Sequence, residues 1–114
     1  MKIYILRKSI TDLKNPIIKN EYITNSVTVK DLITEMVIKN YEKYLLENKT
    51  FKKIDDLNAN IEYALEEFVD GSFYIINNSK NHKYNNLSDL LDIEENDEII
   101  LIKLKYVRGI IWML

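Results

Sequence analysis

The chain has 114 residues, a formal net charge of −2 and no cysteine. This length suits one domain with a single hydrophobic core. The absence of cysteine excludes disulfides and thiolate chemistry and fits a reducing cytoplasm, while the small net charge argues against a nucleic-acid partner. No run of apolar residues is long enough to span a membrane, and the N-terminus lacks the charge order of a signal peptide. We therefore expect a cytoplasmic protein without a membrane span.

The first half of the chain predicts a β-hairpin followed by a helix. Residues 2–7 and 17–24 are rich in β-branched and aromatic side chains, which favours two strands. Thr28 and Asp31 have the spacing of a capping box, the usual start of a helix. Apolar residues with a 3.6-residue period then predict a helix that continues to about Glu47.

The second half predicts another helix and several short strands. The helix begins near Asp56 and ends at Asp70-Gly71, because glycine readily adopts the left-handed conformation that ends helices. The remaining predicted elements are a strand over 72–76, a short strand over 82–84, a helical turn over 87–91, an acidic turn over 94–97 and a final strand over 98–107.

Patterns that would indicate catalysis are nearly absent. His82 is the only histidine, and a general base needs partners that its Lys, Asn and Ser neighbours do not supply. The carboxylates between residues 89 and 98 lack the glycine of a calcium loop, so we interpret them as a solvated turn. Two glycines in the whole chain cannot build a phosphate-binding loop. We therefore expect no enzymatic activity, no cofactor and no bound metal.

A protein-binding surface is the strongest candidate for a functional site. If Ile100, Ile102 and Leu104 face the first helix, strict alternation along a strand turns Leu101 outward. An open sheet face with several apolar side chains is typical of docking surfaces. The alternative is that the second helix or the C-terminal tail covers this face. The predicted protein-binding residues are Tyr4, Leu6, Tyr74, Ile76, Leu101 and, in the tail, Trp112.

The segment from Asn86 to Gly109 resembles the end of a ubiquitin-like β-grasp domain. Leu87-Ser88-Asp89, Asp92-Ile93 and a last apolar strand that runs into Arg108-Gly109 occur in the same order as in that family. The resemblance implies an α+β fold, with a mixed sheet of four to five strands packed by one long helix. It also implies that the first and last strands are parallel neighbours. On this interpretation residues 1–109 form the domain, with an extra inserted helix within an insertion over about 48–70, and residues 110–114 form an apolar tail.

A second resemblance is to the small YukD-type ubiquitin-like proteins of bacterial type VII secretion loci. Residues 28–32 and the stretch from Phe73 through Leu87-Ser88-Asp89 to Ile100 are similar to corresponding parts of those proteins. The resemblance implies a cytoplasmic, non-enzymatic protein-binding module. Such a module would be an accessory or regulatory component of a bacterial protein machinery such as secretion.

Two other interpretations remain open at this point. Arg108-Gly109 occupies the place of the conjugated terminus of ubiquitin, so the chain would be a modifier or sulfur carrier if it were cleaved after Gly109. This alternative requires an activating enzyme as partner. The chain has one glycine at this position, where the family has two. The third interpretation is a homodimer formed through the apolar tail around Trp112.

Overall fold

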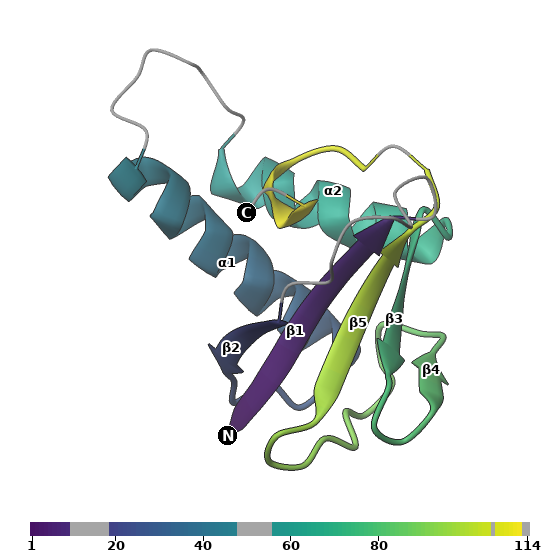
Figure 1. Cartoon of the computed structure of the whole chain (residues 1–114). Coiled ribbons are helices and arrows are strands. Elements are labelled where there is room, and N and C mark those ends of the chain that lie inside the picture. Colours follow the sequence, from purple (N-terminus) through teal and green to yellow (C-terminus); the bar gives the residue numbers. More distant parts are fainter. Residues whose placement is uncertain (10–18, 48–55, 106, 113–114) are drawn as a thin grey trace.

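The computed structural model describes residues 1–9, 19–47, 56–105 and 107–112. These residues form an α+β fold with a five-stranded sheet and two α-helices (Figure 1). The elements in chain order are β1 (Lys2–Ser9), β2 (Lys19–Ile23), α1 (Val29–Glu47), α2 (Leu57–Val69), β3 (Phe73–Asn77), β4 (His82–Tyr84), β5 (Glu98–Lys103) and the 3₁₀ turn η1 (Ile110–Trp112).

The sheet is mixed, with the strand order β2-β1-β5-β3-β4. β1 and β5 run parallel at its centre, and the other three pairs are antiparallel. Parallel neighbours need a long connection, and here the chain between β1 and β5 contains both helices and the β3–β4 hairpin. The predicted mixed sheet and the parallel pairing of its first and last strands are confirmed.

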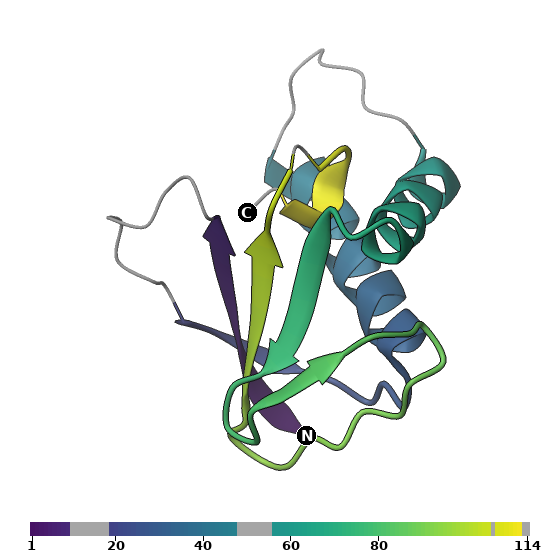
Figure 2. The ribbon, with the colours of Figure 1, turned by 90° about the vertical axis from the view of Figure 1, so that its right-hand side faces the viewer.

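Both helices lie on the same side of the sheet. Figure 2 shows α1 and α2 next to each other on one side, with the strands on the other. Phe68 of α2 packs against Phe73 of β3, with their ring centroids 5.9 Å apart. Two helices, not one long helix alone, therefore cover the sheet, and its other face carries neither of them. No helix in the described part of the chain is long and apolar enough to cross a membrane.

The helix boundaries follow from local side-chain chemistry, as predicted. The Asp31 N–H donates to Thr28 Oγ1 at 3.2 Å, and the Thr28 N–H donates to Asp31 Oδ2 at 3.2 Å. This reciprocal pair is the predicted capping box at the start of α1. At the start of α2, the Asp56 carboxylate accepts the Ala59 N–H at 2.8 Å. After Asp70 the chain leaves the helix through Gly71, whose φ is +80°.

Several predicted boundaries need correction. β5 ends at Lys103 instead of Val107, and the Leu104 N–H then donates to Ser72 O at 2.9 Å. Residues 87–91 form a turn and a bridge between Leu90 and Thr28, not a helical turn. β3 lies one residue later than predicted, and β2 is confirmed over 19–23. Residues 17 and 18 of the predicted second strand, and 48–55 of the predicted insertion, lie outside the described residues.

The predicted phase of β5 was wrong. Ile99 and Leu101 are fully buried against the helices, whereas Ile100 and Ile102 lie on the opposite face. In the sheet, Leu101 pairs with Ile75, and Ile99 pairs with Ile5, which is also buried. Paired residues on neighbouring strands point to the same face, so these pairings determine the phase. Leu101 is therefore a core residue and is not part of an exposed surface.

Candidate protein-docking surface

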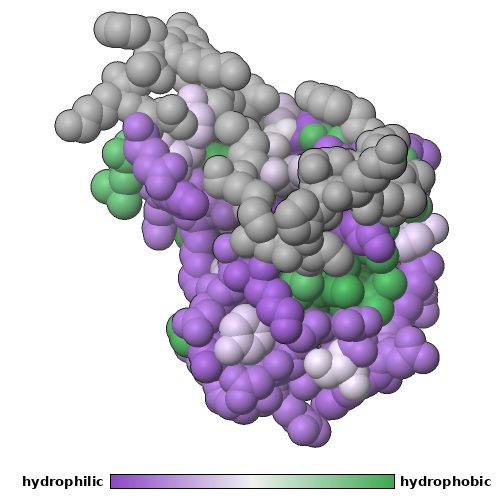
Figure 3. Space-filling model, viewed as in Figure 1, coloured by the Kyte–Doolittle hydropathy of each residue, from purple (hydrophilic) through white to green (hydrophobic). Residues whose placement is uncertain are grey.

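The face of the sheet opposite α1 and α2, here called the open face, carries an ordered row of side chains. Leu6 of β1, Ile100 of β5 and Ile76 of β3 are direct neighbours across the three central strands. The same row ends at Lys19 on β2 and at Lys83 on β4. Three aliphatic residues thus lie between two lysines. Figure 3 shows an apolar area over β5 and β3, bordered by hydrophilic side chains.

A second row extends this apolar area toward the ends of β1 and β5. Ile102 lies between Lys8 and Tyr74. The Lys83 ammonium is 3.9 Å from the centroid of the Tyr74 ring, a cation–π distance. We call the apolar members of the two rows the apolar strip; they are Leu6, Tyr74, Ile76, Ile100 and Ile102. Leu6 is only 5% exposed, and the other four are half-buried, so these four are accessible to a partner.

The structure brings together four of the predicted binding residues. Tyr4, Leu6, Tyr74 and Ile76 face the same side of the sheet, as predicted from alternation. The sequence reasoning missed Ile100 and Ile102, which occupy the place assigned to Leu101. The charged Glu98 alternates in step with Ile100 and Ile102, which correctly indicates that these two side chains lie on the open face. Lys103, at the end of the strand, alternates in step with Ile99 and Leu101 and wrongly indicates that those two do.

Trp112 is not on the open face. It lies in η1 on the helix side of the sheet, 6.4 Å from the Phe73 ring, with the Lys103 ammonium 5.3 Å from its centroid. Ile110 and Ile111 before it are buried in the same core as the helices. The Asn40 side-chain N–H groups donate to the carbonyl oxygens of both residues, at 3.0 and 3.2 Å. Neither α2 nor residues 110–112 cover the open face; residues 113–114 lie outside the described part.

Arg108 and Gly109 are held by two buried polar residues of α2. The Glu67 carboxylate accepts the backbone N–H of Arg108 at 2.9 and 3.0 Å, and its Nε at 3.2 Å. Asn60 Oδ1 accepts the Ile110 N–H at 2.9 Å. A Cβ at position 109 would lie 2.7 Å from this oxygen. We call these contacts the C-terminal clasp.

Sequence reasoning did not identify the clasp residues on α2. Asn60 and Glu67 are two turns apart on one side of the helix, and both are buried. A carboxylate in such a position is rare unless it has a partner. Two polar residues that interrupt the apolar side of α2 therefore indicate buried polar contacts. The sequence does not show which residues are their partners.

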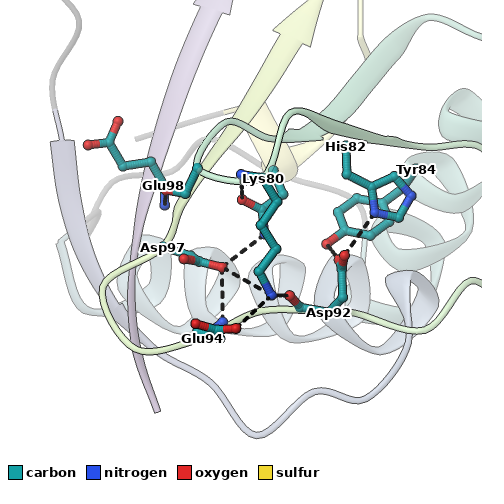
Figure 4. Close-up of polar contacts among 9 residues, drawn as sticks. Lys80, His82, Tyr84, Asp92, Glu94, Asp97 and Glu98 are labelled. Atoms are coloured by element: carbon teal, nitrogen blue, oxygen red, sulfur yellow. Dashed lines mark hydrogen bonds and ion pairs between the residues drawn. The ribbon is translucent and has the colours of Figure 1, made fainter.

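His82 belongs to a small polar cluster at the β4 edge (Figure 4). Its Nδ1 lies 3.1 Å from Asp92 Oδ2, and its ring lies 4.6 Å from the Tyr84 ring. The Tyr84 hydroxyl donates to Asp92 Oδ1, which holds the pKa of Asp92 below its usual range. Burial and the nearby carboxylate raise the pKa of Tyr84. The three side chains connect β4 to the segment before β5.

The carboxylates of the acidic segment, residues 89–98, all have partners within the chain. Asp97 accepts the Glu94 N–H at 2.9 Å and the Asn77 side-chain N–H at 3.0 Å (Figure 4). Lys80 lies between Asp97, Glu94 and the Asp92 carbonyl oxygen. Among the residues that the structure describes, no group of three or more His, Cys, Asp or Glu side chains could hold a metal ion. Local polar contacts therefore hold this segment in place.

A smaller apolar surface lies at the opposite end of the molecule from the clasp. Met1, Val27 and Leu90 are exposed and line a hollow of about 370 Å³. The bridge between Thr28 and Leu90 brings two of these segments together. Sequence reasoning did not find this surface, because its members come from three segments that become neighbours only in the folded chain.

Comparisons of the chain with protein-family models, curated proteins and solved structures found no match.

Proposed function

We propose that this chain is a non-enzymatic protein-binding module with a ubiquitin-like β-grasp fold, and that it docks partner proteins through the open face. The observation that carries the proposal is the apolar strip, which lies between lysines on a sheet face that neither helix covers. Apolar side chains framed by charged ones are typical of protein-interaction sites. Of the four accessible members, three are aliphatic and one is a tyrosine.

The arrangement of elements supports the β-grasp part of the proposal. A β-hairpin is followed by α1 across one face, and the first and last strands are parallel at the centre of the sheet. α2 then represents the inserted helix. Together with the sequence resemblance of residues 28–32 and 73–100, this favours an accessory or regulatory role in a bacterial protein machinery such as type VII secretion, within the cytoplasm.

The alternative of a modifier or sulfur carrier has less support. It requires Gly109 to end a free and flexible segment. Instead, Arg108 is bonded to Glu67, and the Ile110 N–H is bonded to Asn60. Cleavage after Gly109 would remove Ile110 and Ile111 from the core. These contacts favour a structural use of Arg108-Gly109. The contact between Trp112 and Phe73 of the same chain supports a role of Trp112 within the domain over one in a homodimer interface.

The proposal is tested by quantitative capture of proteins from a lysate of the source organism. The bait is the immobilised chain, either unchanged or carrying Tyr74→Asp or Ile76→Asp on the apolar strip. Leu46→Asp is the matched control, because Leu46 on α1 is 80% exposed and lies off the sheet. Circular dichroism and thermal unfolding confirm that each bait is folded.

We expect specific proteins to be retained by the unchanged chain and by Leu46→Asp, and to be lost with both strip variants. A carboxylate in place of an apolar side chain must lose its water when a partner docks, which is unfavourable even with Lys83 nearby. If all four baits retain the same proteins in the same amounts, the open face is not the docking surface.

A further inference from the structure

The open face has the opposite charge balance to the whole chain. The chain carries a net charge of −2. On the open face, the described strand residues include four lysines and two glutamates, namely Lys2, Lys8, Lys19, Lys83, Glu21 and Glu98. The negative charge of the molecule is therefore concentrated elsewhere, and the strip lies in a locally basic surface.

We infer that the open face binds a protein segment that combines apolar side chains with carboxylates. This rests on the proposed function, and it adds the chemistry of the partner. Lys19 and Lys83 end the same row, and five neighbouring strands place their backbones about 19 Å apart. Lys8 ends the second row. Carboxylates on both sides of an apolar stripe would lie opposite the ammonium groups of Lys8 and Lys83, since Lys19 is already paired with Glu98.

The charges on the open face also favour one orientation of the bound segment. In the row next to Lys19, Leu6 and Ile100, Tyr4 lies between Glu21 and Glu98. Glu98 is already paired with Lys19, and this contact holds the pKa of Glu98 below its usual range. Glu21 is exposed at the edge of the sheet. A bound segment is favoured when its carboxylates lie over Lys8 and Lys83 and a basic group lies near Glu21.

A protein segment fits this face better than a nucleic acid does. Single-stranded nucleic acids bind by stacking their bases on open aromatic rings. The centre of the apolar strip is aliphatic, and lysines already lie over both tyrosines of the face. Lys83 is 3.9 Å from the Tyr74 centroid, and Lys2 and Lys19 are 5.6 and 5.7 Å from that of Tyr4.

The test is an NMR titration of the whole chain with two synthetic amphipathic peptides at low ionic strength. Both peptides carry the same Leu/Ile stripe, flanked by glutamates in one and by lysines in the other. The protein is the unchanged chain, the double variant Lys8→Glu/Lys83→Glu, or the control Lys30→Glu/Lys43→Glu. The control makes the same change in net charge on α1, away from the sheet. An oligonucleotide of mixed sequence serves as a third ligand.

We expect the acidic peptide to shift the amide signals of Ile76, Ile100 and Ile102 and to bind severalfold more tightly than the basic one. Lys8→Glu/Lys83→Glu should reverse this preference, added salt should weaken it, and the α1 control should leave it unchanged.

Equal binding of both peptides at these amides would overturn the inference while leaving the docking face intact. Absence of shifts at these amides with either peptide would also overturn the inference. The capture experiment would then decide whether the open face docks proteins at all. Stronger shifts with the oligonucleotide would assign the face to nucleic acid instead.

Discussion

Gly71 and Gly109 have the same backbone conformation in very different surroundings. Both have a φ of +80°, the left-handed region in which a side chain is strained. Around Gly71 there is open space for a Cβ, whereas at Gly109 a Cβ would meet Asn60 Oδ1 at 2.7 Å. The same oxygen holds the Ile110 N–H. Gly109 is therefore required both by its conformation and by its neighbour.

This difference predicts unequal effects of the same substitution at the two glycines. Gly71→Ala should lower the free energy of unfolding by about 1–2 kcal/mol, the cost of the left-handed conformation. Gly109→Ala should cost about 1–3 kcal/mol more, because Asn60 must move and a buried hydrogen bond is lost. Urea unfolding of both variants measures the difference. Equal losses would mean that Asn60 gives way freely.

At the level of elements, short-range polar contacts decide where the helices begin. The capping box of α1 uses Thr28 and Asp31, three residues apart at the first turn of the helix, and α2 begins with the Asp56 cap. Hydrogen bonds from the Thr28 backbone and side chain hold the pKa of Asp31 below its ordinary value. A carboxyl group whose pKa is lower in the folded state stabilises the fold only when it is ionised.

The capping box therefore predicts an acid-dependent contribution to stability. The contribution of Asp31 should be fully present above its unfolded pKa, about 3.9, and should be lost as the pH falls through the lower folded value. Asp31→Asn should be less stable than the unchanged chain at pH 7, and this difference should shrink at about pH 2.5. Chemical unfolding at several pH values measures the difference. A gap that stays constant with pH would contradict the assignment.

At the scale of the whole molecule, the C-terminal segment completes the core. Ile110 and Ile111 pack with α1, and the clasp ties the preceding residues to α2. α2 and the last described residues are thus parts of one packing unit. Although the sequence suggests a separate tail over 110–114, residues 110–112 share the core of the domain.

Removal of residues 110–114 is therefore expected to destabilise the whole fold. Each deleted isoleucine should cost about 2–5 kcal/mol, a large part of the stability of a small domain. The melting temperature should fall by at least about 15 °C, if the shortened chain folds at all. A chain that ends at Trp112 is the control, since it keeps the buried residues. An unchanged melting temperature after removal of 110–114 would favour the modifier or carrier interpretation.

The sequence alone determined the type and approximate limits of most elements, because these depend on contacts between near neighbours. The helix ends depend on hydrogen bonds or backbone conformation within a few residues, as at the Thr28–Asp31 pair, at Asp56 and at Gly71. Alternation also predicted the outward side of β1. For β5 it did not, because four consecutive aliphatic residues at 99–102 fit either phase.

Only the tertiary structure decided the phase of β5, the position of Trp112 and the clasp. Leu101 is buried because its neighbours across the sheet belong to strands that are distant in the sequence. Arg108 contacts Glu67, 41 residues away, and Ile110 contacts Asn60, 50 residues away. The order of residues along a chain does not specify such partners, since each depends on how the sheet and both helices pack together. The row of lysines and aliphatic side chains on the open face exists only once five strands have aligned.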